Sequence, residues 1–175
     1  MAIQTPCPDV EESPLPKDCM KLLGIYLNDH LAGATGGTHR MSRLARAEQE
    51  SPDGGELAQV AAEIEEDQAT LIEVMRQLGV ERQRHKRAAA WAAERLGGLK
   101  LNGRLLRRSP LTTLVELEMM QMAVTGKQAL WATLLRCEMP GEFDFEALIA
   151  RSKRQRKVLQ QVHQRRATNS FTQAD

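Results

Sequence analysis

A long stretch without an internal break, from Ser109 to Cys137, constrains the fold more than any other feature of this sequence. It opens with Ser109, a residue typical of an N-cap, and with Pro110, whose missing N–H costs nothing in the first turn of a helix. Apolar residues occur on almost every side of a helix drawn through this stretch, which is typical of a buried helix. We therefore expect residues 109–137 to form the central helix of a bundle.

Four further segments show the apolar periodicity of helices. Apolar residues recur at steps of three and four over 18–44, and a clear heptad covers 56–78. Amphipathic patterns follow at 81–96 and 144–166. Aromatic residues make up only 3% of the chain, while helix-forming residues are abundant. The sequence therefore predicts an all-α fold, an antiparallel four-helix bundle, ferritin-like or simple up-down, with an additional C-terminal amphipathic helix.

The domain organisation follows from where these patterns begin and end. Residues 1–17 are rich in proline and acids, which predicts a disordered N-terminal arm. Residues 18–166 are expected to form a single helical-bundle domain, since 175 residues are too few for two ordinary domains. Residues 167–175 are expected to form a flexible tail.

Composition argues against several classes of protein. The net charge of +1 gives no global reason for nucleic-acid or membrane binding, and no apolar run is long enough to span a membrane. The first twenty residues lack the basic start and apolar core of a targeting signal. Cys7, Cys19 and Cys137 are odd in number and far apart, which predicts free thiols and a cytoplasmic location.

Three glycines, Gly33, Gly36 and Gly37, interrupt the first helical segment. Each costs about 1 kcal/mol relative to alanine in a helix interior. The small residues could admit a neighbouring helix or an indole such as Trp91 or Trp131. Alternatively, a kink or bulge opens space for a ligand, or the segment forms two shorter helices. The sequence leaves these three interpretations open.

Charge is strongly segregated along the chain. Residues 48–73 hold nine acids and no lysine or arginine, whereas residues 81–108 hold nine bases and two acids. We expect these opposite charges to pair between neighbouring helices. The same segregation would let one molecule pair with another, so we also expect a homo-oligomer.

The last amphipathic segment carries the candidate binding surface. Its polar side would contact an anionic polymer such as nucleic acid, or the acidic second helix, or solvent. No aromatic residues are interleaved for stacking on bases, so nucleic acid is not the favoured partner. The candidate residues are Arg151, Lys153, Arg154, Arg156 and Lys157.

Polar residues interrupt the apolar helix faces at His30, Asp67, Glu118 and Lys127. A charge buried without a partner is costly, so we expect these side chains to pair with one another or to reach solvent at helix edges. The alternative is a degenerate metal or small-ligand site, for which His30, Asp67 and Glu118 are the candidate ligands.

A four-helix arrangement with a buried polar layer resembles the ferritin-like superfamily, and here the resemblance covers residues 18–136. It implies two metal ions held by inward carboxylates and Glu-x-x-His pairs. None of the four histidines is preceded by glutamate at the third position before it. The resemblance therefore implies iron or manganese only through non-standard ligands.

No signature of nucleophilic catalysis and no phosphate-binding loop occurs in the sequence. The leading hypothesis is a non-enzymatic, self-associating interaction or structural protein. One alternative is a ferritin-like metal-binding or redox protein with non-standard ligands. The other is an anionic-polymer binder that uses the basic C-terminal helix.

Overall fold

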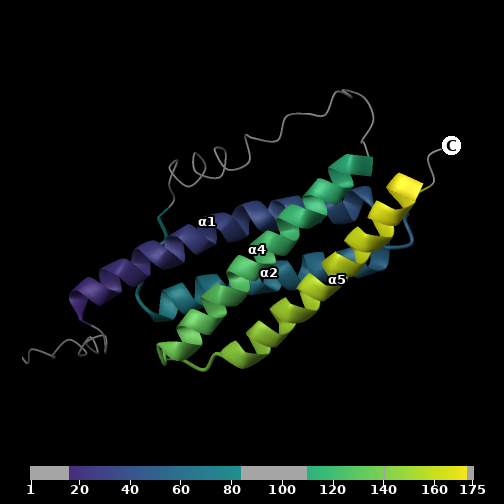
Figure 1. Ribbon diagram of the computed structural model, residues 1–175. Coiled ribbons are helices and arrows are strands. Elements are labelled where there is room, and N and C mark those ends of the chain that lie inside the picture. The colour runs from purple at the N-terminus through teal and green to yellow at the C-terminus, as the bar shows by residue number, and fades with distance from the viewer. Residues whose placement is uncertain (1–15, 84–109, 140, 173–175) are drawn as a thin grey trace, which may run out of the picture.

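The computed structural model describes residues 16–83, 110–139 and 141–172. Over these ranges the protein is all-helical, with four helices and no strand (Figure 1). None of these helices has the apolar length that crossing a bilayer requires. The helices are α1 (Lys17–Ala47), α2 (Gly54–Gln77), α4 (Pro110–Arg136) and α5 (Phe145–Thr172).

The helices form two sequential pairs with short connections, residues 48–53 between α1 and α2 and residues 137–144 between α4 and α5. Each helix packs against two others: α1 against α2 and α4, and α5 against α4 and α2. Figure 1 shows the α4–α5 pair lying across the α1–α2 pair. The four described helices thus pack in a closed ring, and α5 contacts two of the others in it.

The buried core consists of two apolar clusters, and all four helices contribute to both. One cluster includes Leu57 and Leu159, and the other includes Trp131 and Leu148. Because α5 supplies buried residues to each, it is part of the core of the described structure. The helix expected at 81–96 falls almost entirely outside the described residues.

Helix α4 is buried along one side only. Leu117 and Leu134 are fully buried, but Met122 is 67% exposed and Leu111 is 40% exposed. The expectation that this helix is buried on almost every side is therefore wrong for the described structure. The reason is that α1 and α5, its two packing neighbours, cover only part of its circumference.

Several helix boundaries follow the local signals in the sequence. Pro110 is the first residue of α4, as expected from its position after a capping serine. Gly79 follows the end of α2 with a φ of 65°, the left-handed conformation that glycine adopts without a steric penalty. Helix α5 continues to Thr172, so it includes residues 167–172, which the sequence had assigned to the tail.

Helix α1 is continuous through its three glycines, so the interpretation of two shorter helices is wrong. A Cβ atom placed on Gly33, Gly36 or Gly37 would meet no heavy atom of the described chain within 4 Å. No described helix or indole therefore packs closely against these positions. The glycines border open space along an unbroken helix.

Replacing Gly36 by alanine should raise the free energy of unfolding by about 1 kcal/mol, because alanine gains helix propensity and its Cβ meets open space. Urea denaturation of the purified variant measures this change. Gly79→Ala is the matched control and should destabilise the protein, since its positive φ is strained for an L side chain. A Gly36→Ala variant that is less stable than the wild type would contradict an open, regular α1.

Candidate functional site

The side chain of Asp67 is the best-buried carboxylate described, and it joins three helices. It lies on the apolar heptad of α2 and is 0% exposed. Lys127 of α4 donates a hydrogen bond to Oδ2, and Arg151 of α5 donates to Oδ1. Gln155 of α5 donates from Nε2 to Oδ2 at 3.1 Å. Of the four polar residues that were expected to pair with one another or to reach solvent, Asp67 and Lys127 do form a pair.

Two partners of Asp67 make further hydrogen bonds, while Nε of Arg151 is buried without a partner in the described structure. Lys127 Nζ also donates to Gln155 Oε1 at 2.7 Å, and Arg151 Nη1 donates to Glu66 Oε2 at 2.9 Å. Burial lowers the pKa of Lys127, and the negative charge of Asp67 opposes that shift. Charges in such a place persist only when each has partners, because their desolvation is otherwise uncompensated. We call these five residues the core network.

A second set of ion pairs joins the start of α2 to the end of α5. Asp53 accepts hydrogen bonds from Arg165 Nε at 2.9 Å and from Arg166 Nε at 2.7 Å. Arg165 also donates to Glu56 Oε2 at 3.0 Å. Several acids of residues 48–73 thus pair with α5 in the described structure, whereas Glu73 pairs with Arg76 of α2 itself. Most of the expected partner segment, 81–108, lies outside the described residues.

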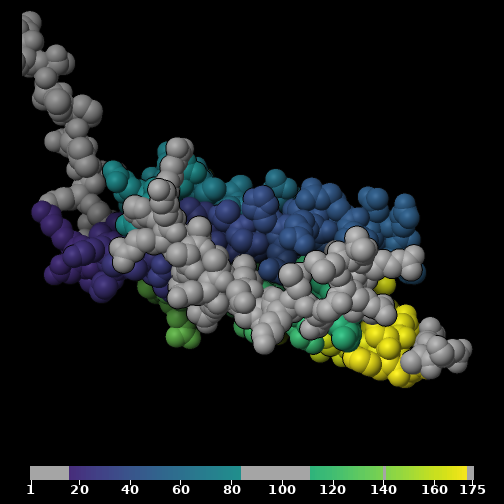
Figure 2. Space-filling model, turned by 90° about the horizontal axis from the view of Figure 1, so that it is seen from above, coloured from purple at the N-terminus to yellow at the C-terminus, as the bar shows by residue number. Residues whose placement is uncertain are grey.

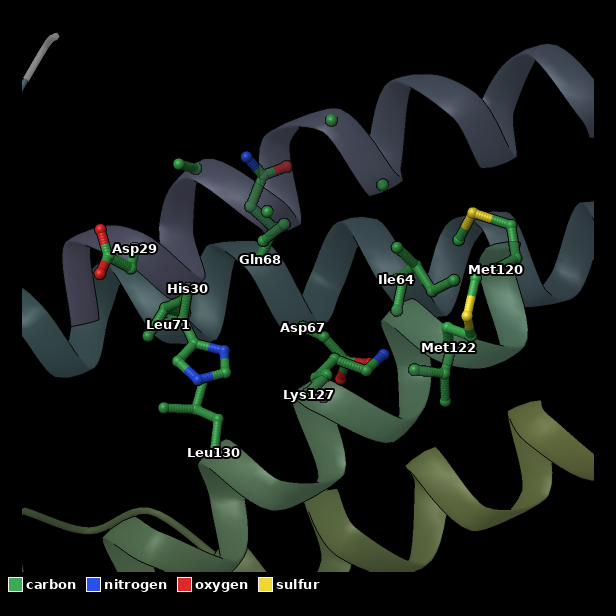
Figure 3. A pocket seen from close by; sticks show the side chains of 18 of the residues that line it. Asp29, His30, Ile64, Asp67, Gln68, Leu71, Met120, Met122, Lys127 and Leu130 are labelled. Atoms are coloured by element: carbon green, nitrogen blue, oxygen red, sulfur yellow. The ribbon is translucent and has the colours of Figure 1, made fainter. Parts of the chain in front are cut away.

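An open cavity of about 630 Å³ lies between α1, α2 and α4 (Figure 3). The glycines of α1 form one wall, and Met119, Met120 and Met122 belong to the wall contributed by α4. Asp67 and Lys127 also line it, so the core network borders the cavity.

The three candidate metal ligands do not converge. His30 is half-buried in the cavity lining, 4.6 Å from the ring of Tyr26, and burial lowers the pKa of its imidazole. Asp67 lines the same cavity, but its oxygens are occupied by the core network. Glu118 is 56% exposed and lies 3.0 Å from His163 Nε2 on α5. Among the described residues, no group of three or more His, Cys, Asp or Glu side chains could hold a metal ion.

The five candidate binding cations separate into two sets. Arg151 is turned inward to the core network, as described above. The other four are exposed on α5, and none has an ion pair within the part of the chain that the structure describes. We call Lys153, Arg154, Arg156 and Lys157 the α5 cation cluster.

Sequence reasoning missed two residues of these sites, Asp53 as an ion-pair partner and Gln155. Gln155 is 1% exposed, and it shares one face of α5 with Leu148 and Leu159. That face repeats at steps of three and four, so the buried position of Gln155 was available from periodicity. No comparable signal marks Asp53, because its partners Arg165 and Arg166 come from a distant segment.

No protein-family model matches this chain, and neither a curated protein nor a solved structure is significantly similar to it. The functional argument therefore depends on the geometry above.

Replacing Asp67 by leucine should lower the free energy of unfolding by about 3–5 kcal/mol, because two cations lose the carboxylate that they share in the core. Denaturant unfolding followed by circular dichroism gives this value.

The double variant Asp67→Leu/Lys127→Met is the matched test, since it removes the buried cation together with its partner. It should recover most of the lost stability, while Arg151 keeps its contact with Glu66. A double variant no more stable than Asp67→Leu alone would mean that the pair is not a coupled unit.

Proposed function

We propose that this chain is a non-enzymatic interaction protein that binds an acidic protein surface through the α5 cation cluster. The observation that carries the proposal is the contrast along α5. Arg151, Arg165 and Arg166 are engaged with carboxylates of the same chain, whereas the four cations of the cluster are exposed and unpaired in the described structure.

A non-enzymatic role is supported by the state of the buried charges. Asp67, the carboxylate best protected from water, is held by two cations and an amide. A general base needs a carboxylate free to accept a proton from substrate. The geometry of Asp67 suits an anchor between helices.

The charges of α2 favour an external acidic partner over a second copy of the chain. Glu56 and Glu66 already accept hydrogen bonds from arginines of α5. A second copy would therefore offer the cluster few free carboxylates on its α2, such as exposed Glu65. This argues against the charge-driven homo-oligomer expected from the sequence.

The size and composition of the cluster favour a protein partner over nucleic acid. Its four cations lie within residues 153–157 and have no aromatic side chain between them. Single-stranded nucleic acids are usually bound by aromatic stacking as well as charge. A short acidic protein segment can be bound by charge alone, and the exposed face of α5 supplies four positive charges.

The scaffold that we infer is an antiparallel four-helix bundle in which α5 is the fourth member. Two observations support it: the short connections within each pair, and the ring of packing contacts among the four helices. A rigid bundle would present the cluster as a fixed surface.

Binding to immobilised poly-glutamate tests the proposed function. Alanine at all four positions of the α5 cation cluster should weaken retention by about tenfold or more at low salt, since each exposed charge pair contributes up to about 1 kcal/mol. Retention of the wild-type protein should fall as salt rises.

The matched control removes four other exposed cations: Lys21, Arg43, Arg46 and Arg136. It loses the same charge, so it should keep its retention if the position of the cluster matters. Two results would contradict the proposal: tighter binding to duplex DNA than to poly-glutamate, or a stable dimer by light scattering that the cluster variant abolishes.

A further inference from the structure

We propose that the cavity between α1, α2 and α4 is the docking site for a segment of this same chain, residues 84–109, with Trp91 as its apolar anchor. The inference goes beyond the proposed function and does not rest on it, because no residue of the α5 cation cluster lines the cavity.

The described residues on either side of this segment are anchored at two distant points of α1. Before the segment, Gln83 donates its backbone N–H to Asn28 Oδ1 in the first half of α1, at 2.8 Å. After it, Thr113 in the first turn of α4 donates to Oε1 of Glu48, the residue that follows α1, at 3.0 Å. Between these two anchors, the chain must therefore travel along most of the length of α1.

The cavity lies along this route. Near one end, Tyr26 of α1 donates a hydrogen bond to Thr133 of α4 at 3.4 Å. Near the other end, Arg40 of α1 lies 3.8 Å from Glu116 of α4. Between these two contacts the walls that α1 and α4 contribute include glycines, and the cavity opens there.

The segment is long enough to follow the cavity and still reach α4. A helix rises about 1.5 Å per residue, so Asn28 and Glu48 lie about 30 Å apart along the axis of α1. A helix over residues 84–96 would cover about 20 Å of that distance. Residues 97–109 reach up to about 40 Å when extended, so they can complete the connection to Pro110 with length to spare.

The first half of the segment has an apolar side that suits the cavity. Residues 81–96 carry the amphipathic pattern predicted above. Alanines on that side would let a helix approach α1 and α4 closely, and an indole that is buried there removes about 150–250 Å² of surface from water. The apolar side consists of Ala88, Ala89, Trp91, Ala92 and Leu96.

The cavity has room for a large side chain from outside the four described helices. An added Cβ at Gly33 of α1 or Gly126 of α4 would meet nothing within 4 Å in the described chain. Methionines of α4 also line the cavity, and their flexible side chains adapt to the outline of what packs against them. Both walls can therefore accept the indole of Trp91.

Charge is complementary at the point where the segment enters the cavity. Asp29 lines the cavity next to the anchor Asn28, is exposed, and has no ion pair among the described residues. The segment begins with three basic residues within four positions: Arg84, Lys86 and Arg87. Opposite charges at this end favour one register of docking over others.

A segment of the same chain also has an advantage over any separate molecule. Because it is tethered at Gln83 and at Pro110, its effective concentration at the cavity is on the order of millimolar. A second copy of the chain or a free ligand would have to displace it from there. The covalent connection therefore favours residues 84–109 as the occupant.

Limited trypsin digestion of the full chain tests the docking. Cleavage after Arg87 and Arg95 should be at least about tenfold slower than in a synthetic peptide of residues 84–109, because the docked segment must open before it is cut. Mass spectrometry identifies the bonds that are cleaved. Cleavage of the wild-type protein as fast as the peptide would overturn the proposal.

Filling the cavity tests the location. Gly126→Leu should raise the cleavage rate at these bonds by about tenfold, since the leucine side chain takes the space of the indole. Gly55→Leu makes the same change at an open position of α2 outside the cavity and should keep the wild-type rate. Circular dichroism checks that each variant is folded, and Gly33→Leu fills the opposite wall if Gly126→Leu does not fold. A filled, folded variant that keeps its protection would contradict docking in this cavity.

Fluorine NMR of protein labelled with fluorotryptophan tests the anchor, and Trp91→Phe assigns the two signals. A soluble gadolinium chelate should broaden the Trp91 signal as little as that of Trp131, which is 0% exposed. In Gly126→Leu, it should broaden the Trp91 signal as strongly as that of free fluorotryptophan. Two results in the wild-type protein would overturn the proposal: a Trp91 signal broadened like the free amino acid, or protection that is lost on dilution, which would assign the cavity to a second copy.

Discussion

The ion pairs of Asp67 with Lys127 and Arg151 are the interaction on which the described packing depends. The side chain of Asp67 has 0% exposure. A carboxylate buried to this degree is tolerated only where cations and hydrogen-bond donors reach it, because the desolvation penalty of an unpaired charge exceeds the free energy gained by packing. Those partners come from α4 and α5, while Asp67 comes from α2. One register of the three helices pairs all three of these charges, and a shift by one turn would leave charges buried without partners.

The same network divides the rest of the molecule into two regions with different chemistry. Charges that point inward are engaged with one another, so the cavity that borders the network is lined by apolar and paired groups. Charges that point outward on α5 remain unpaired in the described structure and give that helix a positive face. The proposed acidic partner follows from the outward charges alone.

Much of the helical framework was predictable from the sequence, because its signals are local. Three features depend only on residues near one another in the chain. They are the heptad of α2 with its buried Asp67, the start of α4 at Pro110, and the glycine that follows α2. The inward turn of Arg151 was not predictable, since a run of basic residues does not reveal which cation meets a distant carboxylate. The open space beside Gly36 was equally hidden, because it depends on three helices at once.

Native-state hydrogen exchange is the most direct test of the claim that the core network couples the helices. If it does, the amides of Asp67, Lys127 and Arg151 should exchange with the same free energy and the same denaturant dependence, as parts of one cooperative unit. The account would be contradicted if amides in the middle of α5 exchanged with a clearly lower opening free energy than amides in the middle of α2. In that case α5 would open while Asp67 on α2 stays protected, so the two helices would not be coupled through this carboxylate.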